Sequence, residues 1–269
     1  MAQQQKYNKL ANKHVLIIGG TSGIGYGVAE ALIESSAHIT ISSSSPDRVK
    51  NAISSLQDSY PLAKTSIKGF ACDLSKPTLE QDLEDLFEKT GEVHHIVFTA
   101  GDRLATTSLA EITLESIQRA GQVRFFAPLL VAKVGRKYLT GGAQSSIVLT
   151  TGSVGDRPMP NWSVVASYAA GLHGMTRNLA LDLKPIRVNL VSPGVIDTEI
   201  WAHMSAEQKG KMFKWVSSTV PTGKVGMPED VAEAYLWLMK DSNVTGIVAY
   251  SDSGTREQGQ EAKVRTAFL

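Results

Sequence analysis

HVLIIGGTSGIG, residues 14–25, is the segment from which the fold of this chain can be inferred. An apolar strand, 14–18, leads into a glycine-rich turn, and the uncharged residues 26–29 continue as a helix. Such a turn brings backbone N–H groups together at a helix N-terminus, where the helix dipole also favours anions. The segment therefore predicts a socket for a phosphate group.

Strands and helices alternate along the rest of the chain. Apolar runs predict strands at about 37–42, 66–71, 93–98, 146–151, 187–191 and 246–250. Helices are predicted between them, at about 46–58, 78–90, 114–139, 163–183 and 228–240. This alternation is typical of right-handed crossovers in a parallel sheet that is covered by helices on both faces. We therefore expect residues 1–269 to form a single α/β domain with a doubly wound parallel sheet.

Composition and charge exclude several classes of protein. The 269 residues carry a formal net charge of +1, which gives no electrostatic basis for binding nucleic acid or a membrane surface. Cys72 is the single cysteine, so no internal disulfide can form, and a reducing compartment is expected. Residues 1–10 lack the apolar core of a signal peptide, and no run approaches the ~20 apolar residues that span a bilayer. We expect a cytoplasmic protein without a membrane, nucleic-acid or metal partner.

Polar residues at the end of the second strand predict which nucleotide is bound. In a doubly wound sheet the ligand lies beyond the carboxyl ends of the strands, and an acid after the second strand binds a ribose 2′-hydroxyl. Here the strand ends in Ser43, Ser44 and Ser45, with Arg48 one turn later and Asp47 as the nearby acid. Hydroxyls and a guanidinium favour a 2′-phosphate, so we expect NADP(H) rather than NAD(H). The serines also suit an N-cap before Pro46, and both roles are compatible.

Two further strand ends predict other walls of the cofactor site. Asp73, followed by Leu74, offers a carboxylate for the adenine amino group, and the segment from Thr99 to Gly101 allows close backbone approach. The expected cofactor residues so far are Gly19, Thr21, Ser22, Gly23, Ile24, Gly25, Ser43, Ser44, Ser45, Arg48, Asp73, Leu74, Thr99, Ala100 and Gly101.

Over about residues 13–254 the sequence resembles the short-chain dehydrogenase/reductase superfamily. The glycine turn matches the first family motif, except that Ile18 replaces the usual Thr, and Thr99-Ala100-Gly101 matches Asn-Asn-Ala-Gly, with Phe98 in place of the first Asn. Ser192-Pro193-Gly194 looks like the segment that meets the nicotinamide, and Asp252-Ser253-Gly254 like the C-terminal Asp-Gly-Gly. The resemblance implies a Rossmann sheet of about seven strands, a homodimer or homotetramer formed through 114–139 and 163–183, and further cofactor contacts from Pro193, Gly194, Val195, Ile196 and Thr198.

The family's catalytic set is only partly present. Ser153 matches the family's Ser, and Tyr168 matches its general-acid Tyr, but Leu172 stands where a Lys is expected four residues later. An unperturbed Tyr has a pKa near 10, and the missing cation would have lowered it. Arg124 occupies the position of the family's Asn. We therefore expect Ser153, Tyr168 and Arg124 to be the catalytic residues.

Three interpretations of these changes remain open. Arg124 supplies the missing charge for carbonyl reduction, or the substrate is a cationic imine that needs no general acid, or the site has left redox chemistry and keeps NADP(H) as a structural element. The local sequence, for example at residues 94–100 and 183–189, looks most like that of divergent fungal members of the superfamily in natural-product pathways. These members include bifunctional reductase/Diels–Alderases. The prediction is an NADPH-dependent reductase of a C=O or C=N bond in a secondary-metabolite intermediate, with a non-redox cyclase or isomerase as the alternative.

The segment 197–225 does not follow the strand–helix alternation. It carries the apolar residues Trp201, Met204, Met212, Phe213 and Trp215, which suggest a lid over an apolar or aromatic small molecule. A helix that packs on the body or on another subunit is the equally weighted alternative.

Overall fold

The sheet predicted from the sequence is confirmed. A computed structural model of the chain describes residues 6–257, apart from the side chains of 64–66. Its seven strands are all parallel and lie in the order β3-β2-β1-β4-β5-β6-β7. They are β1 (His14–Ile18), β2 (His38–Ser43), β3 (Ile67–Ala71), β4 (His95–Phe98), β5 (Ser146–Thr150), β6 (Arg187–Pro193) and β7 (Val248–Ser251).

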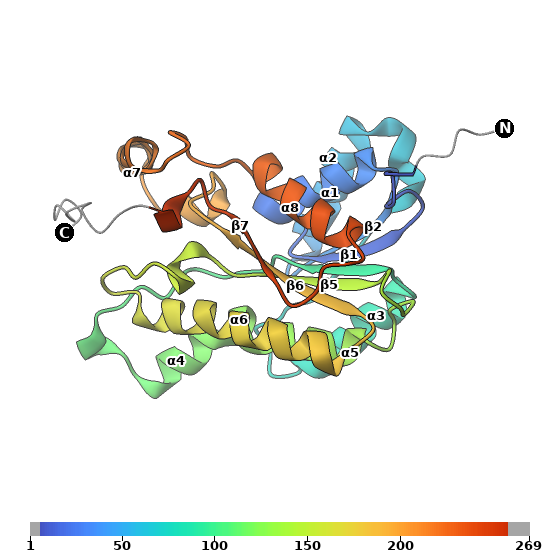
Figure 1. Ribbon diagram of the computed structural model, residues 1–269, viewed down its shortest axis with the longest axis horizontal. Helices are drawn as coiled ribbons and strands as arrows, with labels where there is room; N and C mark the ends of the chain where they lie inside the picture. The colour runs from blue at the N-terminus through green and yellow to red at the C-terminus, as the bar shows by residue number, and fades with distance from the viewer. Residues whose placement is uncertain (1–5, 258–269) are drawn as a thin grey trace.

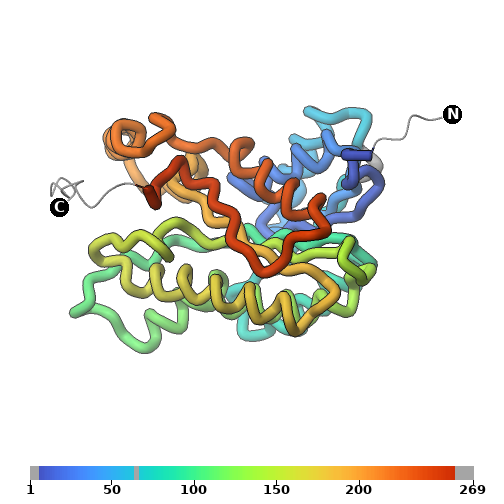
Figure 2. Tube along the Cα trace, viewed as in Figure 1, coloured from blue at the N-terminus to red at the C-terminus, as the bar shows by residue number. Residues whose placement is uncertain are grey.

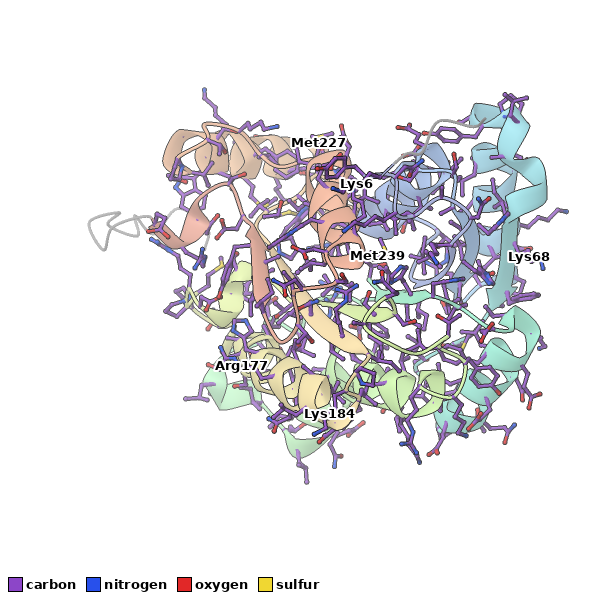
Figure 3. All side chains as sticks on the ribbon, turned by 45° about the vertical axis from the view of Figure 1, so that its right-hand side comes forward. Lys6, Lys68, Arg177, Lys184, Met227 and Met239 are labelled. Carbon is purple, nitrogen blue, oxygen red and sulfur yellow. The ribbon has the colours of Figure 1, made fainter. Side chains whose placement is uncertain are left out.

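Helices cover both faces of this sheet (Figure 1). One layer holds α1 (Gly23–Glu34), α2 (Pro46–Ser59) and α8 (Pro228–Lys240). The other layer holds α3 (Leu79–Thr90), α4 (Leu114–Gly121), α5 (Ala127–Gly135) and α6 (Ser163–Asp182). Figure 3 shows Met239 of α8 and Arg177 of α6 on opposite sides of the sheet. Over the described residues, we find no helix with the length and apolar character needed to cross a membrane.

Successive strand residues build two separate cores. Ile17 belongs to the cluster that contains Val28 of α1 and Tyr235 of α8, whereas Ile18 belongs to the cluster that contains Val131 of α5. This division follows from the two-residue period of a strand, in which successive side chains point to opposite faces. It explains why neighbouring strand residues such as Ile17 and Ile18 are both apolar. The strands therefore form a rigid platform whose carboxyl ends support the site.

The long helix predicted at 114–139 is interrupted. After α4 the backbone forms a π-helical turn, Gln122–Phe126, and α5 ends at Gly135. Leu139 instead makes a parallel bridge to Val93. A π turn holds one residue more than an α turn and changes the direction in which its side chains point. The interruption therefore matters for Arg124, which lies in the middle of it.

The sheet also contains a buried histidine that makes stability depend on pH. His95 is 2% exposed, its Nδ1 lies 2.9 Å from Ser146 Oγ, and burial together with the charge of Arg187 lowers its pKa to about 3. The unfolded chain binds a proton near pH 6.5 and the folded chain does not, so stability is full above pH 6.5 and falls below it. Between pH 7 and pH 5 we expect a loss of about 2 kcal/mol from this residue in urea unfolding. The variant His95→Asn should lose correspondingly less over the same range, and equal losses in both proteins would contradict the assignment.

Candidate functional site

The glycine turn lies at the point where the strand order reverses. β1 has β2 on one side and β4 on the other, so a ligand crevice is expected at the carboxyl ends of β1 and β4. Gly19 has φ +95°, and a Cβ atom there would lie 2.4 Å from the backbone nitrogen of Ala100. A Cβ atom on Gly25 would lie 2.4 Å from Thr99 Oγ1. The turn and the Thr99–Gly101 segment are therefore in direct contact, as a shared cofactor wall requires.

The N-terminus of α1 is suited to an anion. Ser22 is its N-cap and makes no side-chain capping bond, and among the described residues no acidic side chain belongs to the first turn of the helix. The N–H groups of Gly19 and Gly20 both donate to the carbonyl of Ser42, which leaves the later N–H groups of the turn to meet a ligand. A Cβ atom on Gly23 would lie 3.1 Å from Thr198 and 3.4 Å from Glu199 Oε2, so the segment that follows β6 reaches this turn and places one carboxylate beside it.

The serines after β2 form a small donor cluster with Arg48. The guanidinium Nη2 of Arg48 donates to Ser44 Oγ at 2.6 Å, and the Arg48 backbone N–H donates to the N-cap residue Ser45 at 3.4 Å. The N-cap role considered for the serines is thus present at Ser45, and the 2′-phosphate role stays a prediction. Hydroxyl and guanidinium donors in one exposed cluster are suited to a phosphate group.

The acid expected to meet adenine already has partners. The Asp73 carboxylate accepts hydrogen bonds from the Ser75 backbone at 3.1 Å and from the Ser75 hydroxyl at 2.7 Å, and these bonds lower its pKa. Leu74 is buried, and its carbonyl accepts a hydrogen bond from the Gln122 side chain. Asp73 is thus held ionised in a fixed orientation, and adenine recognition stays a prediction.

The segment after β6 is held by the C-terminal residues. Gly194 donates to the carbonyl of Ser251, and a Cβ atom on it would lie 2.8 Å from the Asp252 carbonyl. Ile196 is buried and pairs with Gly226 in an isolated bridge. The stretch from Pro193 to Thr198, which is predicted to meet the nicotinamide, is therefore fixed in place at Gly194 and at Ile196.

The side chain of Arg124 reaches from the π turn to the residues that follow β4. Its Nε donates to Asp102 Oδ1 at 2.9 Å, and its Nη2 donates to the Asp102 carbonyl. The guanidinium lies so close to Gly101 that a Cβ atom there would be 2.8 Å from Nη1. Burial lowers the pKa of the guanidinium, and the Asp102 carboxylate opposes that effect. A charged and ion-paired Arg124 is therefore placed beside the predicted cofactor wall.

Tyr168 of α6 faces α4 and the π turn that carries Arg124, and its hydroxyl makes a hydrogen bond there. The hydroxyl donates to the Ile117 carbonyl of α4 at 3.0 Å, and the ring packs against Phe125 with centroids 5.0 Å apart. Ser153 begins a short 3-10 turn after β5, and the neighbouring Thr151 hydroxyl donates to the carbonyl of Ala169, beside Tyr168. The predicted Ser and Tyr positions thus come together, but the Tyr hydroxyl is not free.

Leu172 is a core residue. It is 3% exposed and belongs to the cluster that contains Leu149 and Leu190. A lysine in that place would bury a charge without a partner, which costs several kcal/mol. The leucine at the position of the family's Lys is therefore part of the core that packs under α6.

Two residues of the site were missed by sequence reasoning. Asp102 directly follows the Thr99–Gly101 segment, and Gln122 begins the π turn. The requirement that a half-buried Arg124 has a counter-ion was the one available signal for Asp102. No signal in the sequence indicated Gln122.

The segment predicted as a lid contains α7 (Ala206–Thr219). Figure 2 shows this helix, in orange, at the same end of the molecule as the yellow-green loop 151–162. Val216 is the one residue of α7 that is buried, whereas Trp215 is 50% exposed. An ion pair of 2.6 Å joins Lys209 of α7 to Asp197. The helix is thus loosely packed, and its role as a lid stays a prediction.

Comparisons with known proteins agree with this geometry. The family model of the SDR-like (short-chain dehydrogenase/reductase-like) Rossmann domain matches residues 6–256 of this chain. The chain is 46% identical over 267 residues to the short-chain dehydrogenase/reductase fsr5 of Gibberella fujikuroi, which covers 95% of this chain and 99% of that protein. It is 42% identical over 252 residues to malC of Malbranchea aurantiaca, which covers 91% and 95%.

Solved structures give the same result. The structure of MalC reductase/Diels-Alderase from Malbranchea aurantiaca is similar with a TM-score of 0.87 and 40% identity, over 94% of this chain and 98% of that one. A small-chain dehydrogenase in complex with NADPH is similar with a TM-score of 0.74 and 29% identity, over 90% and 98%.

Proposed function

Because the chain belongs to the short-chain dehydrogenase/reductase family and is a nicotinamide-dependent oxidoreductase, we propose that it is an NADPH-dependent reductase of a C=N bond in a small apolar natural product. One observation carries the choice of bond: the residues that would protonate a carbonyl oxygen are absent or engaged, with Leu172 buried and the Tyr168 hydroxyl bonded to Ile117. An iminium carbon accepts hydride without receiving a proton, so it needs no general acid.

The residues present fit an NADP(H) molecule. The glycine turn leaves no room for a Cβ atom at Gly19, the N-terminus of α1 has no side-chain cap, and Arg48 and Ser44 offer donors at the end of β2. When bound, NADPH supplies the hydride. Gly19–Gly25 would hold the diphosphate, Ser43–Ser45 with Arg48 the 2′-phosphate, and Pro193–Thr198 the nicotinamide end. An NADPH complex of a relative that is 29% identical supports this assignment.

The preference for the phosphorylated cofactor depends on Arg48. Replacing Arg48 with alanine removes one charge-assisted hydrogen bond, which corresponds to about 1.5–3 kcal/mol. We therefore expect the KM for NADPH to rise about 10- to 100-fold and the KM for NADH to stay unchanged. Lys50→Ala, which removes another exposed cation of the same helix, is the matched control. Equal increases in both KM values would contradict binding of the 2′-phosphate by Arg48.

Each catalytic candidate has a specific role in this proposal. Arg124 supplies hydrogen-bond donors and charge at the rim of the crevice, beside Gly101. Ser153 orients the substrate from the end of β5, and Tyr168 provides an aromatic wall with Phe125. The segment 197–225 with α7 closes over an apolar substrate, and its loose packing supports such a movement.

The proposal is tested by following NADPH absorbance with purified protein. Cyclic iminium ions and ketones of similar size are offered at equal concentration, and we expect NADPH oxidation with the iminium compounds. Consumption of NADPH with ketones alone would overturn the choice of bond. Product formation without NADPH consumption would overturn the reductase proposal itself.

Replacing Tyr168 with phenylalanine separates the two kinds of bond further. With an iminium substrate we expect a turnover rate within about threefold of wild type, because no proton is required. The unfolding free energy should fall by about 1 kcal/mol, since the Ile117 carbonyl loses its donor. A loss of turnover above about 100-fold, measured under the same conditions, would identify Tyr168 as a proton donor instead.

A second candidate function is a non-redox cyclisation that retains bound NADP(H). The MalC relative is a reductase/Diels-Alderase, and its structure is similar over 94% of this chain. Apolar side chains on 197–225, together with Phe125 and Tyr168, would hold a folded apolar substrate. The absorbance experiment above distinguishes this function from the first.

We also propose that the protein is a homodimer or homotetramer in the cytoplasm. Exposed apolar side chains on the helices that the resemblance assigns to the subunit interface support assembly, among them Leu129 of α5 and Leu181 of α6. Light scattering on the purified protein tests the oligomeric state.

A further inference from the structure

The side chain of Arg124 is held by a single neighbouring residue. Asp102 accepts from Nε through its carboxylate at 2.9 Å and from Nη2 through its backbone carbonyl. Asp102 lies just beyond Gly101 at the end of β4, and Arg124 lies in the π turn 22 residues later. Two bonds from the Nε/Nη2 edge of one planar guanidinium fix both its position and its rotation.

The fixed guanidinium leaves one edge for a ligand. Within the described residues Nη1 makes no hydrogen bond, and it lies beside Gly101, where a Cβ atom would be 2.8 Å away. The Cβ position of Gly101 is 2.8–2.9 Å from Nη1, Cζ and Nη2, so the face of the guanidinium lies over this exposed glycine. The arrangement offers the N–H donors of Nη1 to a polar oxygen of the substrate while the other edge stays occupied.

The ion pair also sets the charge of the site. An unpaired Arg124 would repel a cationic substrate, whereas the Arg124–Asp102 pair has no net charge. The Asp102 carboxylate is 40% exposed, which keeps it accessible from the crevice. A site with a neutral pair therefore accepts a cation that a site with arginine alone would disfavour.

We infer that Asp102 is a positioning residue for the reaction: it orients Arg124 so that Nη1 faces the substrate, and it neutralises the arginine charge toward a cationic substrate. This inference rests on the proposed reductase function and assigns a role to a residue outside the family motifs discussed above. Because the contact is local to the end of β4, its removal changes the site without changing the sheet.

The experiment compares Asp102→Ala, Asp102→Asn and Asp102→Glu with wild type by steady-state kinetics. We expect Asp102→Ala to lower kcat about 10- to 100-fold, since a misplacement of about 1 Å at a catalytic group has effects of this size. Asp102→Asn retains an acceptor but loses the charge, so it should raise the KM for an iminium ion at least fivefold more than the inhibition constant of a neutral ketone of the same size that competes with it. Asp102→Glu should recover part of both losses.

A structural readout accompanies the kinetics. The Nε–H proton of Arg124 is bonded to a carboxylate, so its nuclear magnetic resonance signal should exchange slowly with water in wild type and rapidly in Asp102→Ala. Glu80→Gln is the matched control, because it breaks an exposed ion pair with Lys133 of α5 far along the same helical segment. The control should leave kcat, the KM for the iminium ion, the inhibition constant of the ketone and the Arg124 signal unchanged.

The outcomes separate this inference from the proposed function. Unchanged kinetics in Asp102→Ala, with or without a changed Arg124 signal, would overturn the positioning role while the reductase proposal stands. If the wild type forms product without consuming NADPH, the reductase proposal fails, and the same variants are then ranked by product formation. A wild-type rate of product formation in Asp102→Ala would overturn the inference in that case too.

Discussion

Replacing Gly19 with alanine is expected to abolish NADPH binding and to lower the unfolding free energy by about 3 kcal/mol. Gly19 has φ +95°, where an L-residue is strained, and a Cβ atom would lie within 2.4–2.8 Å of backbone atoms of Ala100 and Thr99. Backbone cannot move aside as a side-chain tip can, so the turn must separate from β4. About 3 kcal/mol in a binding equilibrium corresponds to a loss of more than 100-fold in affinity.

A substitution at a second glycine distinguishes the effect of the steric clash from the effect of the backbone strain. Gly91 at the end of α3 has φ +77°, but among the described residues no atom lies within 4 Å of its Cβ position. Gly91→Ala should therefore lose only about 1 kcal/mol in urea unfolding and bind NADPH normally. NADPH binding is measured by fluorescence titration and by the increase in melting temperature. Wild-type affinity in Gly19→Ala would show that the turn does not form the cofactor socket.

The parts of the fold that depend on local sequence were predictable. Ile17 and Ile18 point to opposite faces of β1, and paired apolar residues of this kind require a sheet covered on both sides. The glycine turn was recognisable because strand, turn and helix follow one another without a gap. These features depend on residues within a few positions of each other, and a single sequence contains that information.

The contacts within the site were less predictable, because they depend on how distant segments meet. The apolar pattern over 114–139 is the same for a continuous helix as for one with a π turn, so the direction of Arg124 was not visible. The hydroxyl of Tyr168 bonds to Ile117, 51 residues away, and this pairing follows from the packing of α6 on α4. Asp102 was missed for the same reason. Sequence reasoning could propose positions for the site but could not predict the hydrogen bonds between them.

Replacing Arg124 with methionine is expected to lower kcat by about 100- to 1000-fold, which corresponds to about 3–4 kcal/mol of transition-state stabilisation. Methionine retains much of the apolar volume but has neither the charge nor the donors that face Gly101. The affinity for NADPH should stay within about threefold of wild type, because the diphosphate and 2′-phosphate groups are assigned to the glycine turn and to Arg48. The two effects are measured by single-turnover kinetics and by fluorescence titration.

Two further variants make this result specific to Arg124. Arg119→Met removes an exposed arginine from α4 and should leave kcat unchanged. Arg124→Lys keeps the charge but loses the planar fork that bonds Asp102 on one edge, so its kcat should lie between those of Arg124→Met and wild type. A wild-type kcat in Arg124→Met would exclude the guanidinium from the reaction and would leave Ser153 as the remaining polar candidate. Recovery by lysine to the full wild-type rate would mean that charge alone matters, and the orientation set by Asp102 would then be irrelevant to catalysis.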